Sequence, residues 1–427
     1  MSGAAVRAVF LGLLRVFYPQ IAVRGPTPPA GVGTIFVANH PNGLLDPLVV
    51  RLALGRPVAF LAKSTLFSIP VLRGWLRAFD AIPVYRAKEA DTAQNERTFQ
   101  LARGRVDSGG ALALFPEGIS HDEPRLAPLK TGAARIALGC DVSARIVAVG
   151  IAYESKETFR SRVSATLGPP IDLAPYRAQA ALDERAAVVA LTARVAAALQ
   201  EVMIEADDAE LWSGFVTVAS WLVGDADVGA RDARARSLAR DWRQLASRDP
   251  TEAEALADEA RAFAHTLSEL GLRDAFALDG GAAHPIRAGA KGLALLAMLP
   301  LAAIGALLGW LPYRIIRPVS IRLAKGERDV VGTYKLLIGL VLMPAWWCAQ
   351  AAVIGYWLSW GVGLAVLALA PLTGFAALRF DERLTARRAL LRASWLTATR
   401  ADEARAVADR RRALAERITQ ATRANSR

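Results

Sequence analysis

The stretch NHPNGLLDP, residues 39–47, places a histidine, His40, six positions before an aspartate, Asp46. A carboxylate in contact with an imidazole holds the ring in one tautomer, so that the other ring nitrogen can take a proton from a hydroxyl group. On a continuous α-helix the two side chains would be rotated by about 240° from each other, because each residue turns the helix by about 100°. The pair can act together only if the chain turns between them.

Three residues that favour such a turn, Pro41, Asn42 and Gly43, follow the histidine. Proline fixes φ, and glycine accepts positive φ without steric cost. If the next helix begins at or after Gly43, Asp46 lies in its first turn and can reach back to His40. The alternative for this stretch taken alone is a histidine that caps a helix and an aspartate that pairs with a surface arginine.

Two further stretches carry polar residues at the ends of apolar runs. In FPEGIS, residues 115–120, Glu117 and Gly118 can bring a carboxylate and backbone N–H groups close to a polar substrate, although such a tripeptide is also typical of a plain turn. In IPVYR, residues 82–86, Arg86 can hold a phosphate through its planar guanidinium, the alternative being an ordinary surface arginine.

Short apolar runs bounded by turn residues dominate residues 25–177. Each run is typical of a buried strand, and helical patterns at 91–106 and 129–140 lie between them. This alternation predicts an α/β domain, a sheet flanked by helices, with polar residues collected along one sheet edge. The predicted strands are GTIFVANH (33–40), PVAFLAKS (57–64), DAIPVYRA (80–87), GALALFPEG (110–118) and ARIVAVGIAYE (144–154).

The second half of the chain is predicted to be helical and to include membrane segments within 291–380. Residues 178–290 have a helical period and form a helical region without an assigned role. The stretches 336–358 and 361–378 contain no charge, and each is close to the roughly 20 residues that cross a ~30 Å hydrocarbon layer. The uncharged stretch 292–311, which Pro300 interrupts, either spans or re-enters, and 381–427 form a basic helical tail.

The distribution of basic residues favours one orientation in the membrane. Both the connection at 312–335 and the tail after 378 are rich in arginine and therefore favour the cytoplasmic side. If the region before 290 is cytoplasmic too, 292–311 should be re-entrant or interfacial. The N-terminal region 1–24 has Arg7 and Arg15 within an apolar helical pattern, which predicts a helix on the membrane surface or, alternatively, a soluble packing helix.

Composition supports a soluble part joined to a membrane part. Mean hydropathy is positive although 22% of the 427 residues are charged. The two cysteines, Cys140 and Cys348, lie far apart and provide neither a disulfide framework nor a metal-binding spacing. The net charge of +12 occurs without any nucleic-acid-binding motif, so we expect contact with an anionic phospholipid membrane and no nucleic acid.

Together these stretches resemble the glycerolipid acyltransferase superfamily, in which an Asn-His is followed by an Asp. Here five residues separate His40 from Asp46 where most members have four, which is similar to the branch that contains fungal glycerol-3-phosphate and dihydroxyacetone-phosphate acyltransferases. The resemblance covers about residues 30–175. Its other motifs are AKSTLFSIPVLRGWLRAFDAIPVYR (62–86), FPEGISHDEPRLAPLKTGAARIAL (115–138) and IVAVGIAYESKETFRSR (146–162).

The resemblance implies roles for particular residues. His40 would be the general base and Asp46 its partner, with Glu117 completing the catalytic set; Gly118 would shape the acceptor site. The family's third motif usually continues Thr-Arg-Ser, but here it continues with Ile-Ser-His, and the last of these, His121, would be a second catalytic candidate or a polar residue at the site edge. The phosphate ligands would be Arg86, with Lys63, Arg125 and Lys130 as basic replacements for the missing arginine.

The implied function is a membrane-bound acyltransferase in phospholipid synthesis. It would move a fatty acyl group from acyl-CoA or acyl-carrier protein to glycerol 3-phosphate, dihydroxyacetone phosphate or lysophosphatidic acid, with no metal and no cofactor. A non-catalytic lipid-binding protein is the alternative, and the intact His40, Asp46 and Glu117 argue against it. An esterase or thioesterase is another, although no G-x-S-x-G motif occurs. The oligomeric state is not predicted.

Overall fold

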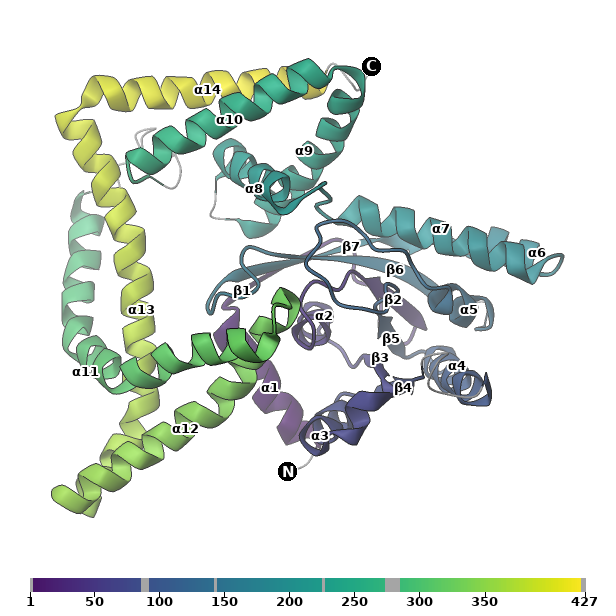
Figure 1. Cartoon of the computed structure of the whole chain (residues 1–427), viewed down its shortest axis with the longest axis horizontal. Helices are drawn as coiled ribbons and strands as arrows, with labels where there is room; N and C mark the ends of the chain where they lie inside the picture. Colours follow the sequence, from purple (N-terminus) through teal and green to yellow (C-terminus); the bar gives the residue numbers. More distant parts are fainter. Residues whose placement is uncertain (1–2, 86–91, 142–143, 225–226, 273–284, 424–427) are drawn as a thin grey trace. The chain divides into compact units, whose positions relative to one another are not determined.

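The protein has two compact units (Figure 1). A computed structural model describes residues 3–85, 92–141, 144–224, 227–272 and 285–423. The first unit, called here the α/β unit, comprises Met1–Val216, Ala226–Ala239 and Glu327–Thr333. The second, the helical unit, comprises Thr217–Asp225, Arg240–Gly326 and Tyr334–Arg427.

The α/β unit contains one seven-stranded sheet with the strand order β1-β7-β6-β2-β5-β3-β4. All neighbouring strands are parallel except β6 and β7, which are antiparallel. The predicted α/β fold with a mixed sheet is therefore confirmed. Because β2, β3, β4, β5 and β6 all run the same way, their carboxyl ends share one sheet edge. The strands are β1 (Gln20–Arg24), β2 (Thr34–Ala38), β3 (Ala59–Lys63), β4 (Ala81–Val84), β5 (Ala111–Leu114), β6 (Arg145–Tyr153) and β7 (Arg162–Ile171).

Five of these strands were predicted, and β1 and β7 were not. β1 lies within the range 1–24 that was predicted as a helix, so that prediction is wrong for its last residues: helix α1 ends at Phe17. Pro19 explains this end, because proline disfavours helical backbone at the residue before it. Strand β7 contains a Gly-Pro-Pro sequence at 168–170, which is typical of a turn and hid the strand. These residues lie beyond the part of β7 that pairs with β1, so the prolines have no partner strand on that side.

Helices cover both faces of the sheet, and α7 is part of the core. Its residues Leu191, Val195 and Leu199 recur every four positions and are buried with Ile35 and Ile146 of the sheet. Helix α7 therefore belongs to the α/β unit. The sequence had instead predicted that a separate helical region begins at residue 178. The helices of this part are α1 (Gly3–Phe17), α2 (Leu45–Leu54), α3 (Pro70–Ala78), α4 (Thr92–Asp107), α5 (Gly132–Leu138), α6 (Ala174–Ala180) and α7 (Glu184–Val202).

Helix α1 packs against α3 through one of its faces. The Arg7 guanidinium donates to the carbonyl of Ala78 at 2.7 Å, and the rings of Phe10 and Trp75 lie 6.2 Å apart. Phe17 is buried at the end of α1. The opposite face of α1 keeps large apolar side chains exposed, so its contact with a membrane surface stays a prediction.

Among the described residues, three helical segments are long and apolar enough to cross a membrane: Ala294–Ala324, Arg328–Trp357 and Trp360–Thr385. The predicted spans 336–358 and 361–378 lie in the second and third. The stretch 292–311 lies in one helix that continues past Pro300. The remaining described helices are α8 (Ala209–Val223), α9 (Val228–Arg248), α10 (Pro250–Glu269), α11 (Pro285–Ala324), α12 (Val331–Trp357), α13 (Trp360–Thr399) and α14 (Ala401–Arg423).

The packing of α7 on β6 can be tested with Gly150→Ala. A Cβ atom at Gly150 would lie 2.0 Å from the carbonyl oxygen of Val202, so backbone must move to admit it. We expect a loss of about 1–3 kcal/mol in the free energy of unfolding, measured by thermal denaturation in detergent. The control is Gly104→Ala in α4, where nothing lies within 4 Å of the added methyl group and a small gain is expected. Equal stability of the two variants would contradict the packing.

Candidate active site

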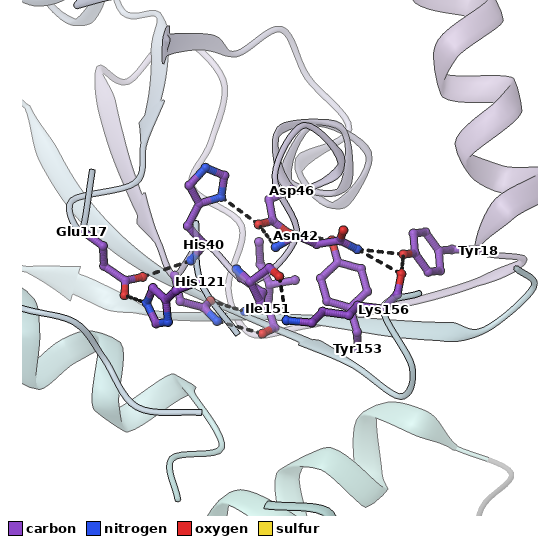
Figure 2. Close-up of polar contacts among 11 residues, drawn as sticks. Tyr18, His40, Asn42, Asp46, Glu117, His121, Ile151, Tyr153 and Lys156 are labelled. Carbon is purple, nitrogen blue, oxygen red and sulfur yellow. Dashed lines mark hydrogen bonds and ion pairs between the residues drawn. The ribbon is translucent and has the colours of Figure 1, made fainter. Parts of the chain in front are cut away.

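Polar side chains collect at the shared carboxyl edge of the parallel strands, as predicted (Figure 2). His40 lies two residues beyond β2, Glu117 three residues beyond β5, and Tyr153 is the last residue of β6. Lys63 ends β3 at the same edge. Segments far apart in the sequence therefore meet at one site.

His40 and Asp46 face each other, with His40 Nδ1 and Asp46 Oδ2 2.8 Å apart. The predicted turn is confirmed: Gly43 has a φ of +38°, and helix α2 begins at Leu45. The N–H of Leu45 donates to the carbonyl of Asn42 at 2.9 Å and closes the turn. Asp46 consequently occupies the first turn of α2, from which it reaches back to the imidazole.

The carboxylate of Asp46 is fully buried and hydrogen-bonded through both oxygens. Oδ2 also accepts the backbone N–H of Asn42 at 2.7 Å, and Oδ1 accepts the hydroxyl of Tyr153 at 2.6 Å. Burial, reinforced by the negative charge of Asp46, raises the pKa of Tyr153 well above its ordinary value. Tyr153 therefore remains a hydroxyl donor at neutral pH, and three donors hold the carboxylate in one position.

The second ring nitrogen of His40 is available for chemistry. Nε2 forms no hydrogen bond with any residue that the structure describes, whereas Nδ1 is held by Asp46. The imidazole stacks on the ring of Phe115 with centroids 4.0 Å apart and planes 13° from parallel. Its side chain is 18% exposed, so a substrate hydroxyl can reach it. This geometry suits a general base.

The loop that contains Glu117 holds the backbone of His40. Glu117 Oε1 accepts the N–H of His40 at 3.1 Å, and the N–H of His121 donates to the carbonyl of His40 at 3.2 Å. Oε2 of Glu117 accepts the N–H of Ala127 at 2.9 Å and also contacts His121 Nε2. These contacts make Glu117 a positioning residue for His40, and they engage His121 with Glu117 instead of with Asp46.

Several residues that complete the site were not predicted. Asn39 joins β2 to β6, because its side-chain amide bonds both the carbonyl and the N–H of Ile151. The amide of Asn42 donates to the hydroxyl of Tyr18 at 2.9 Å, and Tyr18 donates to the carbonyl of Lys156 at 2.7 Å. Both asparagines lie in NHPNGLLDP and Lys156 lies in the motif at 146–162, although none was given a role, and Tyr18 lies outside all of the motifs.

Lys130, one of the predicted phosphate ligands, lies beside the Glu117–Gly118 turn. Gly118 has a φ of +71°, and a Cβ atom there would lie 2.4 Å from Lys130 Nζ. The N–H of Gly118 is already engaged by the carbonyl of Phe115 at 3.0 Å. Arg125 is exposed, with its guanidinium 4.0 Å from Asp207. Arg86 lies outside the described residues.

A metal site and a cysteine nucleophile are two alternatives to the His40–Asp46 pair. Among the described residues, no group of three or more His, Cys, Asp and Glu side chains could hold a metal ion. Burial raises the pKa of Cys140 to about 12, so its thiol is protonated at neutral pH and is a poor nucleophile. The His40–Asp46 pair remains the best candidate for catalysis.

Comparison with known families confirms the resemblance drawn from the motifs. Residues 20–152 match the family model described as Acyltransferase, and this segment contains His40, Asp46 and Glu117. Residues 320–425 match a second model, described as the C-terminal domain of glycerol-3-phosphate acyltransferase 2.

Individual relatives match only part of the chain. Glycerol-3-phosphate O-acyltransferase 2 of Saccharomyces cerevisiae is 37% identical over 20% of this chain and 12% of its own length. The chloroplastic 1-acyl-sn-glycerol-3-phosphate acyltransferase BAT2 of Brassica napus is 32% identical over 26% of this chain and 30% of its own. The crystal structure of a 1-acyl-sn-glycerophosphate acyltransferase from Thermotoga maritima shares 19% identity and a TM-score of 0.32, covering 46% of this chain and 79% of that one. The matched segments span less than a third of the length of either curated relative.

The support of Asp46 can be tested with Tyr153→Phe. The change removes the hydroxyl that bonds Asp46 Oδ1 and leaves a buried carboxylate oxygen without that donor. We expect a loss of about 1–3 kcal/mol in the free energy of unfolding, measured by thermal denaturation in detergent. Tyr176→Phe is the control, because the hydroxyl of Tyr176 bonds no described residue and its loss should be nearly neutral. Equal stability of the two variants would contradict the role of Tyr153.

Proposed function

We propose that this protein is a membrane-bound O-acyltransferase of glycerolipid synthesis. In this proposal it moves a fatty acyl group from the thioester of acyl-CoA or acyl-carrier protein to a hydroxyl of glycerol 3-phosphate. The observation that carries the proposal is the 2.8 Å contact between His40 and Asp46, with the second imidazole nitrogen left free, inside an acyltransferase-family domain.

The proposed reaction needs no group beyond side chains and backbone. His40 Nε2 takes the proton of the acceptor hydroxyl, and Asp46 stabilises the imidazolium that forms. The hydroxyl oxygen attacks the thioester carbonyl and forms a tetrahedral oxyanion, which requires hydrogen-bond donors. Collapse of this intermediate forms the ester and breaks the carbon–sulfur bond. The departing thiolate then takes the proton from His40, so the base is regenerated without a metal or cofactor.

Rigid support of the base is part of the proposed mechanism. The side chain of His40 is held by Asp46, and its backbone is held on both sides by the loop of Glu117 and His121. Such constraint keeps Nε2 aimed at one point, which lowers the entropic cost of aligning the acceptor hydroxyl. Glu117 acts here through His40 and not on the substrate.

The acceptor is proposed from chemistry and from the relatives' names. The C-terminal family model and the yeast relative are both named for glycerol 3-phosphate, whereas the Brassica napus relative is named for its 1-acylated form. Both acceptors present a hydroxyl near a phosphate, and Lys130 beside the Gly118 turn is the proposed phosphate ligand. Lysophosphatidic acid is thus the second candidate acceptor.

Membrane attachment is supported by three long apolar helices in the described part of the chain. We propose that the acyltransferase domain lies on the cytoplasmic face, because residues 312–335 and the tail after α13 are rich in basic residues. A site at the membrane surface would release its acylated product directly into lipid.

The proposed function can be tested with membranes that contain the protein. Radiolabelled acyl-CoA or acyl-carrier protein would be supplied with glycerol 3-phosphate, dihydroxyacetone phosphate or lysophosphatidic acid, and lipid products separated by chromatography. We expect an acylated product with at least one acceptor, and a loss of about 10²–10⁴-fold in rate for His40→Ala. Asp46→Asn keeps the size of the side chain and should also reduce the rate.

Three outcomes of this assay would contradict the proposal. Product formation that survives His40→Ala would exclude His40 as the base. Thioester loss without any acceptor would favour a thioesterase. Lipid binding with no turnover of any donor and acceptor pair would favour a non-catalytic lipid-binding protein.

The phosphate ligand can be tested with Lys130→Ala. Removing this ammonium group should raise KM for the phosphorylated acceptor by about tenfold while changing kcat little, because a hydrogen bond to a charged group contributes about 1.5–3 kcal/mol. Arg125→Ala is the matched control, since it removes a cation that points toward Asp207 and should leave KM unchanged. A rise in KM for Arg125→Ala alone would reassign the ligand.

A further inference from the structure

Residues Glu327–Thr333, which end the α11–α12 connection and begin α12, belong to the α/β unit and contact the active-site turn. A Cβ atom at Gly332 would lie 3.0 Å from Asn42 Oδ1, and one at Gly43 would lie 3.3 Å from the carbonyl oxygen of Asp329 and from Thr333 Oγ1. Asp329 and Thr333 are both 7% exposed. The connection therefore lies on the same side of the membrane as the α/β unit.

Helices α10 and α14 of the helical unit contact each other. Arg417 of α14 forms ion pairs with Glu252 and Glu259 of α10, at 3.1 and 2.5 Å. Arg411 of α14 is 9% exposed and donates to the carbonyl of Trp221 at 3.1 Å. Because Arg417 of α14 pairs with two glutamates of α10, these two helices lie on one side of the membrane.

These contacts limit the number of crossings between α10 and α14. The chain leaves and returns to the same side, so the number of crossings must be even, yet three helices of the described residues are long and apolar enough to cross. A crossing α11 would place the α11–α12 connection on the far side, away from the turn that it touches. Helix α8 (Ala209–Val223) precedes α11 and is apolar, but it is shorter than the roughly 20 residues that a span requires. It therefore adds no crossing between the α/β unit and α10.

Helix α11 bends along its length (Figure 1), and its backbone hydrogen bonding is interrupted at one of its prolines. Pro312 has no N–H to donate to the carbonyl of Leu308, four residues earlier. Two side chains of α12 take its place: Trp346 Nε1 donates to that carbonyl at 2.7 Å and Gln350 Nε2 at 2.9 Å. A free carbonyl in hydrocarbon would be costly, so these two donors make the bend tolerable inside a membrane.

The first arm of α11, before the bend, runs antiparallel to α13. Met298 contacts Arg383, with its sulfur 2.8 Å from the guanidinium. Further along, Gly305 lies so close to Thr373 that a Cβ atom would overlap its carbonyl. As residue numbers rise along α11, they fall along α13.

The second arm runs antiparallel to α12 instead. Leu308 lies beside Trp346 and Gln350, and Gly339 lies against Ile316. Helices α12 and α13 themselves form a hairpin, since Ser359 caps α13 directly after α12 ends. A straight helix cannot run antiparallel to both helices of a hairpin. The bend of α11 therefore reverses its direction across the membrane.

We infer that α11 is a re-entrant element, which enters and leaves the membrane on the face that carries the α/β unit, and that the chain crosses only at α12 and α13. The second arm of α11 and the residue after it carry exposed basic side chains, which then contact anionic lipid headgroups on that face instead of lying on the far side. These residues are Arg314, Arg317, Arg322 and Lys325. The inference is independent of the proposed reaction.

Cysteine accessibility in sealed vesicles tests this topology. In a background with Cys140 and Cys348 both changed to Ala, single exposed positions would be changed to cysteine: Glu254→Cys in α10, Glu327→Cys in the α11–α12 connection and Leu358→Cys at the hairpin tip. A membrane-impermeant maleimide would be applied to vesicles of both orientations, before and after permeabilisation. Resistance of each variant to alkaline extraction would verify its membrane insertion.

We expect Glu254→Cys and Glu327→Cys to be labelled from the same face and Leu358→Cys from the opposite face. Labelling of Glu327→Cys together with Leu358→Cys would show that α11 crosses, and would overturn the inference. Labelling of all three from one face would show that the α12–α13 hairpin does not cross, which would overturn it as well. The readout requires no enzymatic activity, so failure of the topology and failure of the proposed function can be distinguished.

Discussion

The buried carboxylate of Asp46 is the constraint on which the rest of the site depends. A charged group removed from water is costly unless hydrogen-bond donors replace its hydration. Here those donors come from His40, from the backbone of Asn42 and from Tyr153 at the end of β6. The turn after β2, the start of α2 and the register of β6 beside β2 must therefore all be correct together, and a shift in any one would leave the carboxylate short of a donor.

The His40 backbone is held separately from its ring. The loop after β5 accepts the N–H and supplies a donor for the carbonyl of His40, while Asp46 fixes the imidazole. Because β5 pairs with β2 in parallel, the two motifs emerge side by side at the same sheet edge. The Asn-His and Pro-Glu-Gly motifs are thus parts of one structure, in which Glu117 positions the residue that performs the proposed chemistry.

Local patterns predicted the central strands and the reactive pair, and long-range contacts decided the rest. The His40–Asp46 contact could be predicted because a proline and a glycine mark the turn between them. The roles of Tyr153 and Tyr18 could not be predicted, because the local sequence does not distinguish them from other aromatic residues. Only the fold brings their hydroxyl groups to the site. Strand β7 was hidden by its Gly-Pro-Pro sequence, which the sheet tolerates because these residues lie beyond the pairing with β1.

The path of the apolar helices also depends on contacts between residues far apart in the sequence, which local patterns do not report. Pro300 interrupts the apolar stretch 292–311, yet α11 continues through Pro300, Pro312 and Pro318. At Pro312, side chains of another helix satisfy the carbonyl group that the proline leaves free. At Leu308 the replacement donors come from Trp346 and Gln350, about forty positions later in the chain. Hydropathy reports only whether a segment can enter hydrocarbon. Whether it crosses depends on where its ends are held, and in this chain one end is held against the catalytic turn.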